Sequence, residues 1–225
     1  MSTTTVPRVV LSDLGPVAQL RAGRMGRRLV QLVAGLLLYG FSIALMVRSG
    51  LGLAPWDVLH SGLTHWLPVD IGQALVITSF VVMLAWIPLR EMPGVGTIAN
   101  AVVIGVSADL LLAVLPTIDA LTARGALLVA GVLLNGLATA AYIGAQLGRG
   151  PRDGLMTGLA RRTGHSLRLV RTTMELTVVV IGLLLGGVAG LGTIVYAVAI
   201  GPLSQALLPP LLVPLDARED ADVSA

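Results

Sequence analysis

Long apolar runs are the feature that most constrains this 225-residue chain. Six stretches are rich in Leu, Val, Ile, Ala and Gly. Each is roughly 18–23 residues long, which lets a helix cross the ~30 Å hydrocarbon core of a bilayer. Charged residues make up 12% of the chain, against about 25% in a soluble domain. We therefore expect an all-α polytopic membrane protein with six transmembrane helices, at residues 29–47, 72–89, 95–115, 124–146, 167–187 and 191–212. Trp66 and Trp86 lie near predicted span ends, where an indole ring prefers the membrane interface.

The sequence also contains an internal repeat at an offset of 96 residues. LGLAPWDVLHSGL at 51–63 aligns with LGRGPRDGLMTGL at 147–159, and GTIANAVVIG at 96–105 aligns with GTIVYAVAIG at 192–201. Of the 78 aligned pairs around these segments, 24 are identical, which favours a true repeat over shared composition. Two copies of a three-span unit follow, and an odd number of crossings requires the second copy to be inverted relative to the first.

Arginine predicts the orientation of the two units. The segment from Arg48 to Asp70 contains one arginine and two aspartates, whereas its counterpart from Ala145 to Arg168 contains five arginines and one aspartate. By the positive-inside rule, the first segment lies outside and the second lies in the cytoplasm of a bacterial inner membrane, together with both termini. The predicted organisation is a basic N-terminal segment, a first repeat, a second repeat and an acidic tail, at 1–28, 29–116, 117–212 and 213–225.

Residues 12–28 are expected to form a short surface helix. Its arginines recur at helical spacing and predict a basic face that anchors the chain to anionic lipid headgroups. They are Arg21, Arg24, Arg27 and Arg28.

The doubled motif has the composition of a helix start. Proline is tolerated at the first helical position, and aspartate in the first turn accepts free N–H groups and complements the helix dipole. Pro55 and Pro151 therefore predict short helices that begin after the first span of each repeat. Two placements remain open, flat at the interface or re-entrant with the helix starts near the membrane midplane. The motif residues expected to form these broken helices are Gly52, Pro55, Ser61, Gly148, Pro151 and Thr157.

Charged residues in the motifs are candidates for binding a substrate or protons. An arginine inside a membrane is costly unless it is paired. Arg152 therefore requires Asp57, Asp153, an anionic ligand or a shallow position. First-turn aspartates also occur for structural reasons alone. His60 follows Asp57 by three positions, which predicts a polar contact on one helix face or a proton relay.

Further candidates lie within the expected spans. Arg171 and Glu175 have the (i, i+4) spacing of an ion pair, and an intramembrane carboxylate otherwise marks a proton or substrate path. Asp109 is a coupling residue or an outer-end residue that reaches the headgroups, and Asn100 predicts interhelical hydrogen bonding or a polar pocket. The glycine row at 182, 186 and 190 predicts close helix packing, within the fold or in a homodimer.

Enzymatic chemistry has little support. The chain has no cysteine and no lysine, which excludes thiolate chemistry, a Walker phosphate loop and a Schiff-base lysine. No catalytic or metal-binding motif is recognisable, so we expect no enzyme, no cofactor and no metal.

The doubled L-G-x-x-P-x-D-x-L-x-[S/T]-G-L motif, with G-T-I-x-x-A after each copy, resembles the YczE/YitT-like group of bacterial integral membrane proteins. The resemblance covers roughly residues 28–212. It implies a small inner-membrane protein, often considered a transporter, and carries no substrate residues over to this chain.

Two functions are compatible with these features. The first is a small secondary transporter or permease whose polar site for a small molecule or ion lies between the repeats. The alternative is a non-transporting component, either a substrate-capture subunit of a larger transporter or an accessory scaffold. In both cases the lipid bilayer is a partner, and no nucleic acid is expected.

Overall fold

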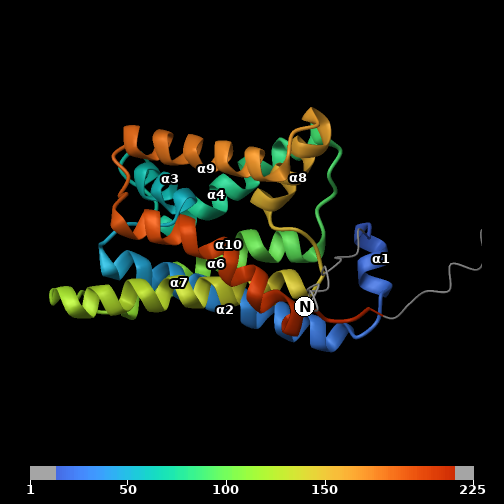
Figure 1. Ribbon diagram of the computed structural model, residues 1–225, viewed down its shortest axis with the longest axis horizontal. Coiled ribbons are helices and arrows are strands. Elements are labelled where there is room, and N and C mark those ends of the chain that lie inside the picture. Colours follow the sequence, from blue (N-terminus) through green and yellow to red (C-terminus); the bar gives the residue numbers. More distant parts are fainter. Residues whose placement is uncertain (1–13, 216–225) are drawn as a thin grey trace, which may run out of the picture.

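The computed structural model describes residues 14–215, and this part of the chain is all-helical (Figure 1). The acidic tail residues Asp216, Glu219, Asp220 and Asp222 lie outside the described residues. In chain order the helices are α1 (Pro16–Arg21), α2 (Met25–Ser49), α3 (Pro55–Leu63), α4 (Ile71–Leu84), α5 (Trp86–Leu89), α6 (Val95–Val114), α7 (Leu121–Gly144), α8 (Pro151–Thr163), α9 (Leu167–Leu184) and α10 (Leu191–Leu211).

Within the described residues, four helices are long and apolar enough to cross a membrane: α2, α6, α7 and α10. The expected span at 72–89 is instead two helices. Pro88 lacks a backbone N–H, and its ring crowds the carbonyl four residues earlier, which is that of Leu84. This explains why α4 ends at Leu84 and α5 starts after Ala85.

The expected span at 167–187 yields α9, which is not among the four long apolar helices. α9 carries three charged residues in its first half: Arg168, Arg171 and Glu175. These charges lower the mean hydropathy of a helix that is long enough to cross a bilayer.

The long helices lie along the long axis of the molecule, and the short helices α3 and α8 lie toward opposite ends (Figure 1). The most extensive packing is between α2 and α7, the first long helix of each repeat copy. α6 packs against α2, and α10 packs against α7 in the same way. α3 packs against α9, while α8 contacts α4, so each short helix lies against a helix of the other copy.

Two hydrogen bonds join the copies at equivalent positions. The Gly192 N–H donates to the Leu51 carbonyl over 2.8 Å, and the Gly96 N–H donates to the Leu147 carbonyl over 2.8 Å. Leu51 and Leu147 are equivalent in the repeat, as are Gly96 and Gly192. Each motif loop is therefore held by the start of the last long helix of the opposite copy.

Two arginines show the same reciprocity. Buried Arg28 donates from Nε to the Ala145 carbonyl (2.9 Å) and from Nη2 to the next carbonyl (2.6 Å), just beyond the end of α7. Arg124 donates from Nε to the Ser49 carbonyl (2.6 Å) and from Nη2 to the Gly50 carbonyl (3.0 Å), at the end of α2. The carbonyls left free where a helix of one copy ends are thus capped by an arginine of the other.

The expected surface helix at 12–28 is wrong for its described part. α1 ends at Arg21, and the backbone turns through Gly23 (φ 79°) and Arg24 (φ 51°) before α2 begins. Arg27 is exposed, but Arg28 points into the protein and binds backbone carbonyls instead of lipid headgroups. Arginine spacing alone does not reveal the turn, because the same spacing fits an unbroken helix.

Replacing Arg28 should destabilise the fold. Arg28→Gln leaves the carbonyls of Gln19, Ala145 and Gln146 without a charged donor. Since hydrogen bonds to charged groups contribute about 1.5–3 kcal/mol each, we expect a loss of about 3 kcal/mol in the free energy of unfolding. Thermal unfolding in detergent measures this loss. The neighbouring Arg27→Gln is the control and should change stability by less than about 0.5 kcal/mol; equal effects of the two variants would refute the capping role.

Candidate functional site

A cavity of about 220 Å³ lies where the two motif copies meet. The starts of α3 and α8 both reach it, so motif residues far apart in sequence share one lining. These include Pro55 and Trp56 from the first motif and Gly150, Arg152 and Asp153 from the second. The other polar lining residues are Tyr39, Asn100, Thr139, Tyr142, Arg171, Glu175, Tyr196 and Ser204.

Glycine allows the motif loops to pack closely against the opposite copy. Gly52 and Gly148 have φ values of 123° and 129°, which residues with side chains rarely adopt. A Cβ on Gly52 would lie 2.8 Å from the Gly190 nitrogen and 2.9 Å from the Thr193 nitrogen. A Cβ on Gly148 would lie 3.0 Å from the Thr97 hydroxyl oxygen. These close approaches bring the two helix starts into the interior.

Both short helices start with proline and have no side-chain cap, because the preceding residues are an alanine and a glycine. The first-turn aspartates were expected to accept free N–H groups, but their contacts are different. Asp57 Oδ1 lies 3.0 Å from Nδ1 of buried His60, on the same helix face, as the spacing predicted. Asp153 Oδ2 accepts a hydrogen bond of 2.5 Å from the Tyr142 hydroxyl.

Arg152 lines the cavity and lies over two of its aromatic rings. Its guanidinium carbon lies 5.5 Å from the centroid of the Trp56 ring and 5.9 Å from that of Tyr39, both within the range of cation–π contacts. Among the described residues, no carboxylate oxygen lies within salt-bridge distance of Arg152. Arg152 therefore makes no direct salt bridge with Asp57 or Asp153, although both carboxylates lie near enough to interact with its charge.

Other expected polar residues of the cavity have partners of their own. Arg171 Nε donates to Glu175 Oε1 over 2.9 Å, which is the ion pair that the spacing predicted. Asn100 is buried and lines the cavity together with its repeat counterpart Tyr196. The Tyr196 hydroxyl donates to Asn135 (2.9 Å), so interhelical hydrogen bonding runs along one wall.

Asp109 lies apart from this cavity. Its carboxylate accepts hydrogen bonds from the backbone N–H groups of Gly72 (2.7 Å) and Gln73 (3.0 Å), which caps the start of α4. Asp109 also lines a second hollow of about 560 Å³, together with Asp70 and His65. The structure therefore does not bring Asp109 to the motif residues.

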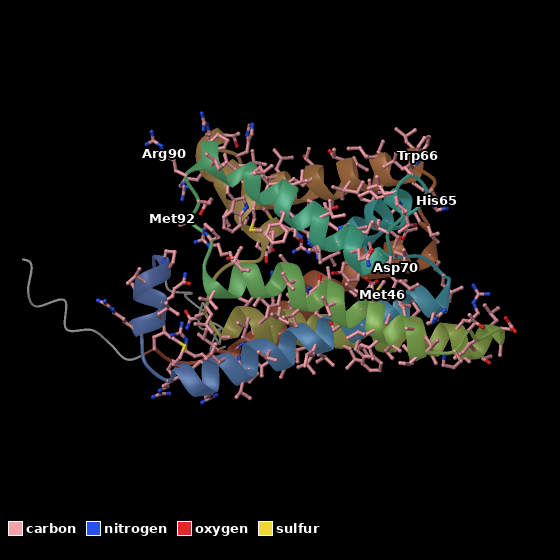
Figure 2. The ribbon with its side chains drawn as sticks, turned by 180° about the vertical axis from the view of Figure 1, so that it is seen from behind. Met46, His65, Trp66, Asp70, Arg90 and Met92 are labelled. Carbon is pink, nitrogen blue, oxygen red and sulfur yellow. The ribbon has the colours of Figure 1, made fainter. Side chains whose placement is uncertain are left out.

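The second hollow lies toward one end of the bundle. Figure 2 places His65 and Trp66 at this end, with Arg90 and Met92 at the other. Of the two motifs, only the first contributes lining residues to this hollow, whereas the cavity of about 220 Å³, the central cavity, is lined by residues of both motifs.

The two hydroxyl residues of the motifs serve packing. The Ser61 hydroxyl donates to the Val58 carbonyl (2.9 Å) and accepts the Val188 N–H (3.0 Å), which ties α3 to the loop before α10. Its counterpart Thr157 donates to the Gly154 carbonyl (3.1 Å) within α8.

Sequence reasoning placed Tyr196 beside Asn100 in a polar pocket but missed the rest of the aromatic part of the site. The chain has three tyrosines, and all three line the cavity: Tyr39, Tyr142 and Tyr196. Trp86, expected at the membrane interface, is buried in the protein, and its indole N–H donates to the Pro151 carbonyl over 3.0 Å. The sequence did contain a sign of this aromatic lining. Aromatic residues make up only 4% of the chain, and the tyrosines lie within the expected spans.

The lining offers no visible place for a metal ion. In the described residues, no group of three or more His, Asp or Glu side chains is arranged to hold one. The arrangement can instead bind a small polar solute through its arginine, hydroxyl and amide groups.

Apolar helices of membrane-crossing length around a polar cavity define a multi-pass helical membrane protein. The chain belongs to a family of unknown function (DUF6198), whose model matches residues 26–209. It is 41% identical to an uncharacterized protein of Haemophilus influenzae over 177 residues, covering 79% of this chain and 81% of the relative. It is 34% identical to the uncharacterized membrane protein YczE of Bacillus subtilis over 178 residues, covering 78% and 83%. No solved structure matches the chain. The resemblance to YczE-like proteins is thereby confirmed.

Substituting Gly52 should cost stability. Gly52→Ala forces a Cβ onto backbone atoms of the opposite copy at a φ of 123°, so we expect a loss of about 2 kcal/mol or more in the free energy of unfolding. Gly26→Ala is a matched control, since a Cβ there meets nothing within 4 Å and alanine favours the helix. Thermal unfolding in detergent compares the two. A Gly52→Ala protein as stable as the control would contradict the close approach.

Proposed function

We propose that the chain is a small secondary transporter or permease that binds its substrate in the central cavity. The observation that carries this proposal is that the starts of both broken helices line one polar cavity. Substrate sites of this kind form where discontinuous helices from two repeats meet, because the broken helices supply backbone polar groups at membrane depth. A rigid scaffold would have no need of a polar cavity inside an apolar bundle.

The proposal includes six crossings arranged as two inverted units in a bacterial inner membrane. The reciprocal contacts of Leu51 with Gly192 and of Leu147 with Gly96 support a two-fold relation between the copies. In this arrangement α4 with α5 is one of the crossings of the first unit and α9 is its counterpart in the second, while α3 and α8 are re-entrant helices from opposite faces. By the positive-inside rule, the arginines of α8 and its flanking loops favour a cytoplasmic position for that end and for both termini.

Different contacts hold α3 and α8 in place. α3 packs tightly on α9, where a Cβ on Gly182 would lie 2.6 Å from the Leu59 nitrogen. At the other end, Glu91 lies 3.0 Å from Arg161 and 3.6 Å from Arg149, which links the loop before α6 to α8. The arginine sides of these two pairs are 40% and 57% exposed, and ion pairs that are partly exposed are weak and salt-sensitive. We infer that the cytoplasmic end opens more readily than the glycine-packed end.

Cysteine labelling tests the topology. The chain has no cysteine, so single cysteines can be introduced without other changes. Trp66 and Arg162 are exposed, equivalent positions of the two copies. In spheroplasts, a membrane-impermeant maleimide should label Trp66→Cys directly and Arg162→Cys only after permeabilisation. Labelling of both from the same side would rule out inverted units.

Flux measurements test transport. Purified protein in liposomes loaded with a defined mixture of amino acids, carboxylic acids, sugars, nucleosides and inorganic ions should release at least one component faster than protein-free liposomes. Thr139→Trp places a large ring in the cavity and should reduce that flux at least about tenfold, because the solute and the ring compete for one volume. Leu133→Trp on the exposed side of the same helix is the control and should retain flux.

A negative result in this screen would favour the other function. If no component moves but the protein co-purifies with an energising ATPase or another membrane complex, the chain is a capture subunit or scaffold and not a transporter.

A further inference from the structure

We propose that the central cavity binds a small anion, such as a carboxylate or an inorganic oxyanion, with Arg152 as its counter-ion. The proposal specifies the chemical class of the solute, and it rests on the proposed function of the central cavity as the solute site. Three observations lead to it: the hydrogen bonding of the charged lining residues, the N–H donors at the helix starts and the size of the cavity.

Hydrogen bonding distinguishes Arg152 from the other charged residues of the cavity. Among the described residues that line the cavity or adjoin it, the carboxylates have other partners: Asp57 contacts His60, Asp153 accepts from Tyr142, and Glu175 pairs with Arg171. The rings of Trp56 and Tyr39 attract the guanidinium, but they do not satisfy its five N–H donors as a carboxylate does. A guanidinium in a membrane interior is costly without such acceptors, and an anionic ligand supplies them.

The starts of α3 and α8 add N–H donors, which carry partial positive charge like the guanidinium of Arg152. α3 and α8 both begin at the cavity, and neither has a side-chain cap. The N–H groups in a first helical turn have no acceptor within the helix, and the positive end of the helix dipole lies there. Two such starts and one guanidinium around one cavity favour a hydrogen-bond acceptor with negative charge.

The volume limits the ligand. About 220 Å³ is smaller than the roughly 300–1,000 Å³ of pockets that hold drug-sized molecules. Aromatic side chains contribute part of the wall, which suits a short carboxylate with a few carbon atoms as well as a compact oxyanion. A cationic substrate would be repelled by the guanidinium of Arg152, and Asp57, Asp153 and Glu175 each already have a hydrogen-bond partner within 3.0 Å.

Equilibrium binding tests the proposal without requiring transport. The full chain in nanodiscs is titrated by calorimetry with sodium acetate, lactate, phosphate and sulfate at constant ionic strength, with choline chloride and glycerol as cationic and neutral probes. At least one anion should bind saturably. Arg152→Gln should weaken that binding at least about tenfold, and Arg152→Lys by less, because lysine keeps the charge without the planar fork.

Two further variants set the controls. Arg168→Gln removes an exposed arginine of α9 and should leave anion affinity unchanged. Asp153→Asn removes a negative charge from the lining and should leave anion affinity equal or higher, whereas it would abolish binding at a cation site. Each variant is first checked for cooperative thermal unfolding, and Arg152→Lys replaces Arg152→Gln if the latter does not fold.

The outcomes separate this inference from the transporter proposal. Failure of all four anions to bind, equal binding by Arg152→Gln, or binding of choline that Asp153→Asn abolishes would overturn the anion site, even if liposomes show flux. Arg152-dependent anion binding without flux would keep the anion site and overturn the transporter.

Discussion

Backbone that leaves a helix inside a membrane protein must find its hydrogen-bond partners within the protein, because hydrocarbon supplies none. In this chain the partners come from the opposite repeat copy. The carbonyls of Leu51 and Leu147 accept from Gly192 and Gly96, and arginines of the opposite copy cap the helix ends next to them. The free backbone groups at each helix break are hydrogen-bonded by residues of the other copy. The two repeat copies must therefore fold together.

These hydrogen bonds between the two copies also determine where the cavity forms. Close approach of backbone to backbone at the two breaks requires glycine at positions 52 and 148, and the chain then has few residues before proline begins the short helix. The helix starts consequently face the interior, where they line the same polar cavity. A site between the copies is a geometric consequence of satisfying the broken backbone.

Hydrophobic runs and proline predicted the helical membrane class and the two short helices, but not the contacts that depend on assembly of the copies. Arg28 looked like a lipid anchor because a basic stretch does not reveal the carbonyls beyond α7 that this side chain caps. A signal was present, since Arg28 and Arg124 are separated by the repeat offset, but both lie before the aligned segments. Trp86 near the end of an apolar run suggested the interface. Its burial depends on α8 of the other copy, where a Cβ on Gly154 would collide with the indole ring.

One difference between the two motifs has a physical reason in the lining of the cavity. Trp56 and Arg152 are equivalent positions in the repeat, and their side chains meet there with 5.5 Å between guanidinium carbon and ring centroid. Identical residues at these positions would place two arginines, which repel, or two tryptophans, which carry no charge, against each other. One of each instead gives a stabilising cation–π contact and leaves a single positive charge at this point of the cavity. The difference between Trp56 and Arg152 thus contributes to the asymmetry of a site built from two equivalent helix starts.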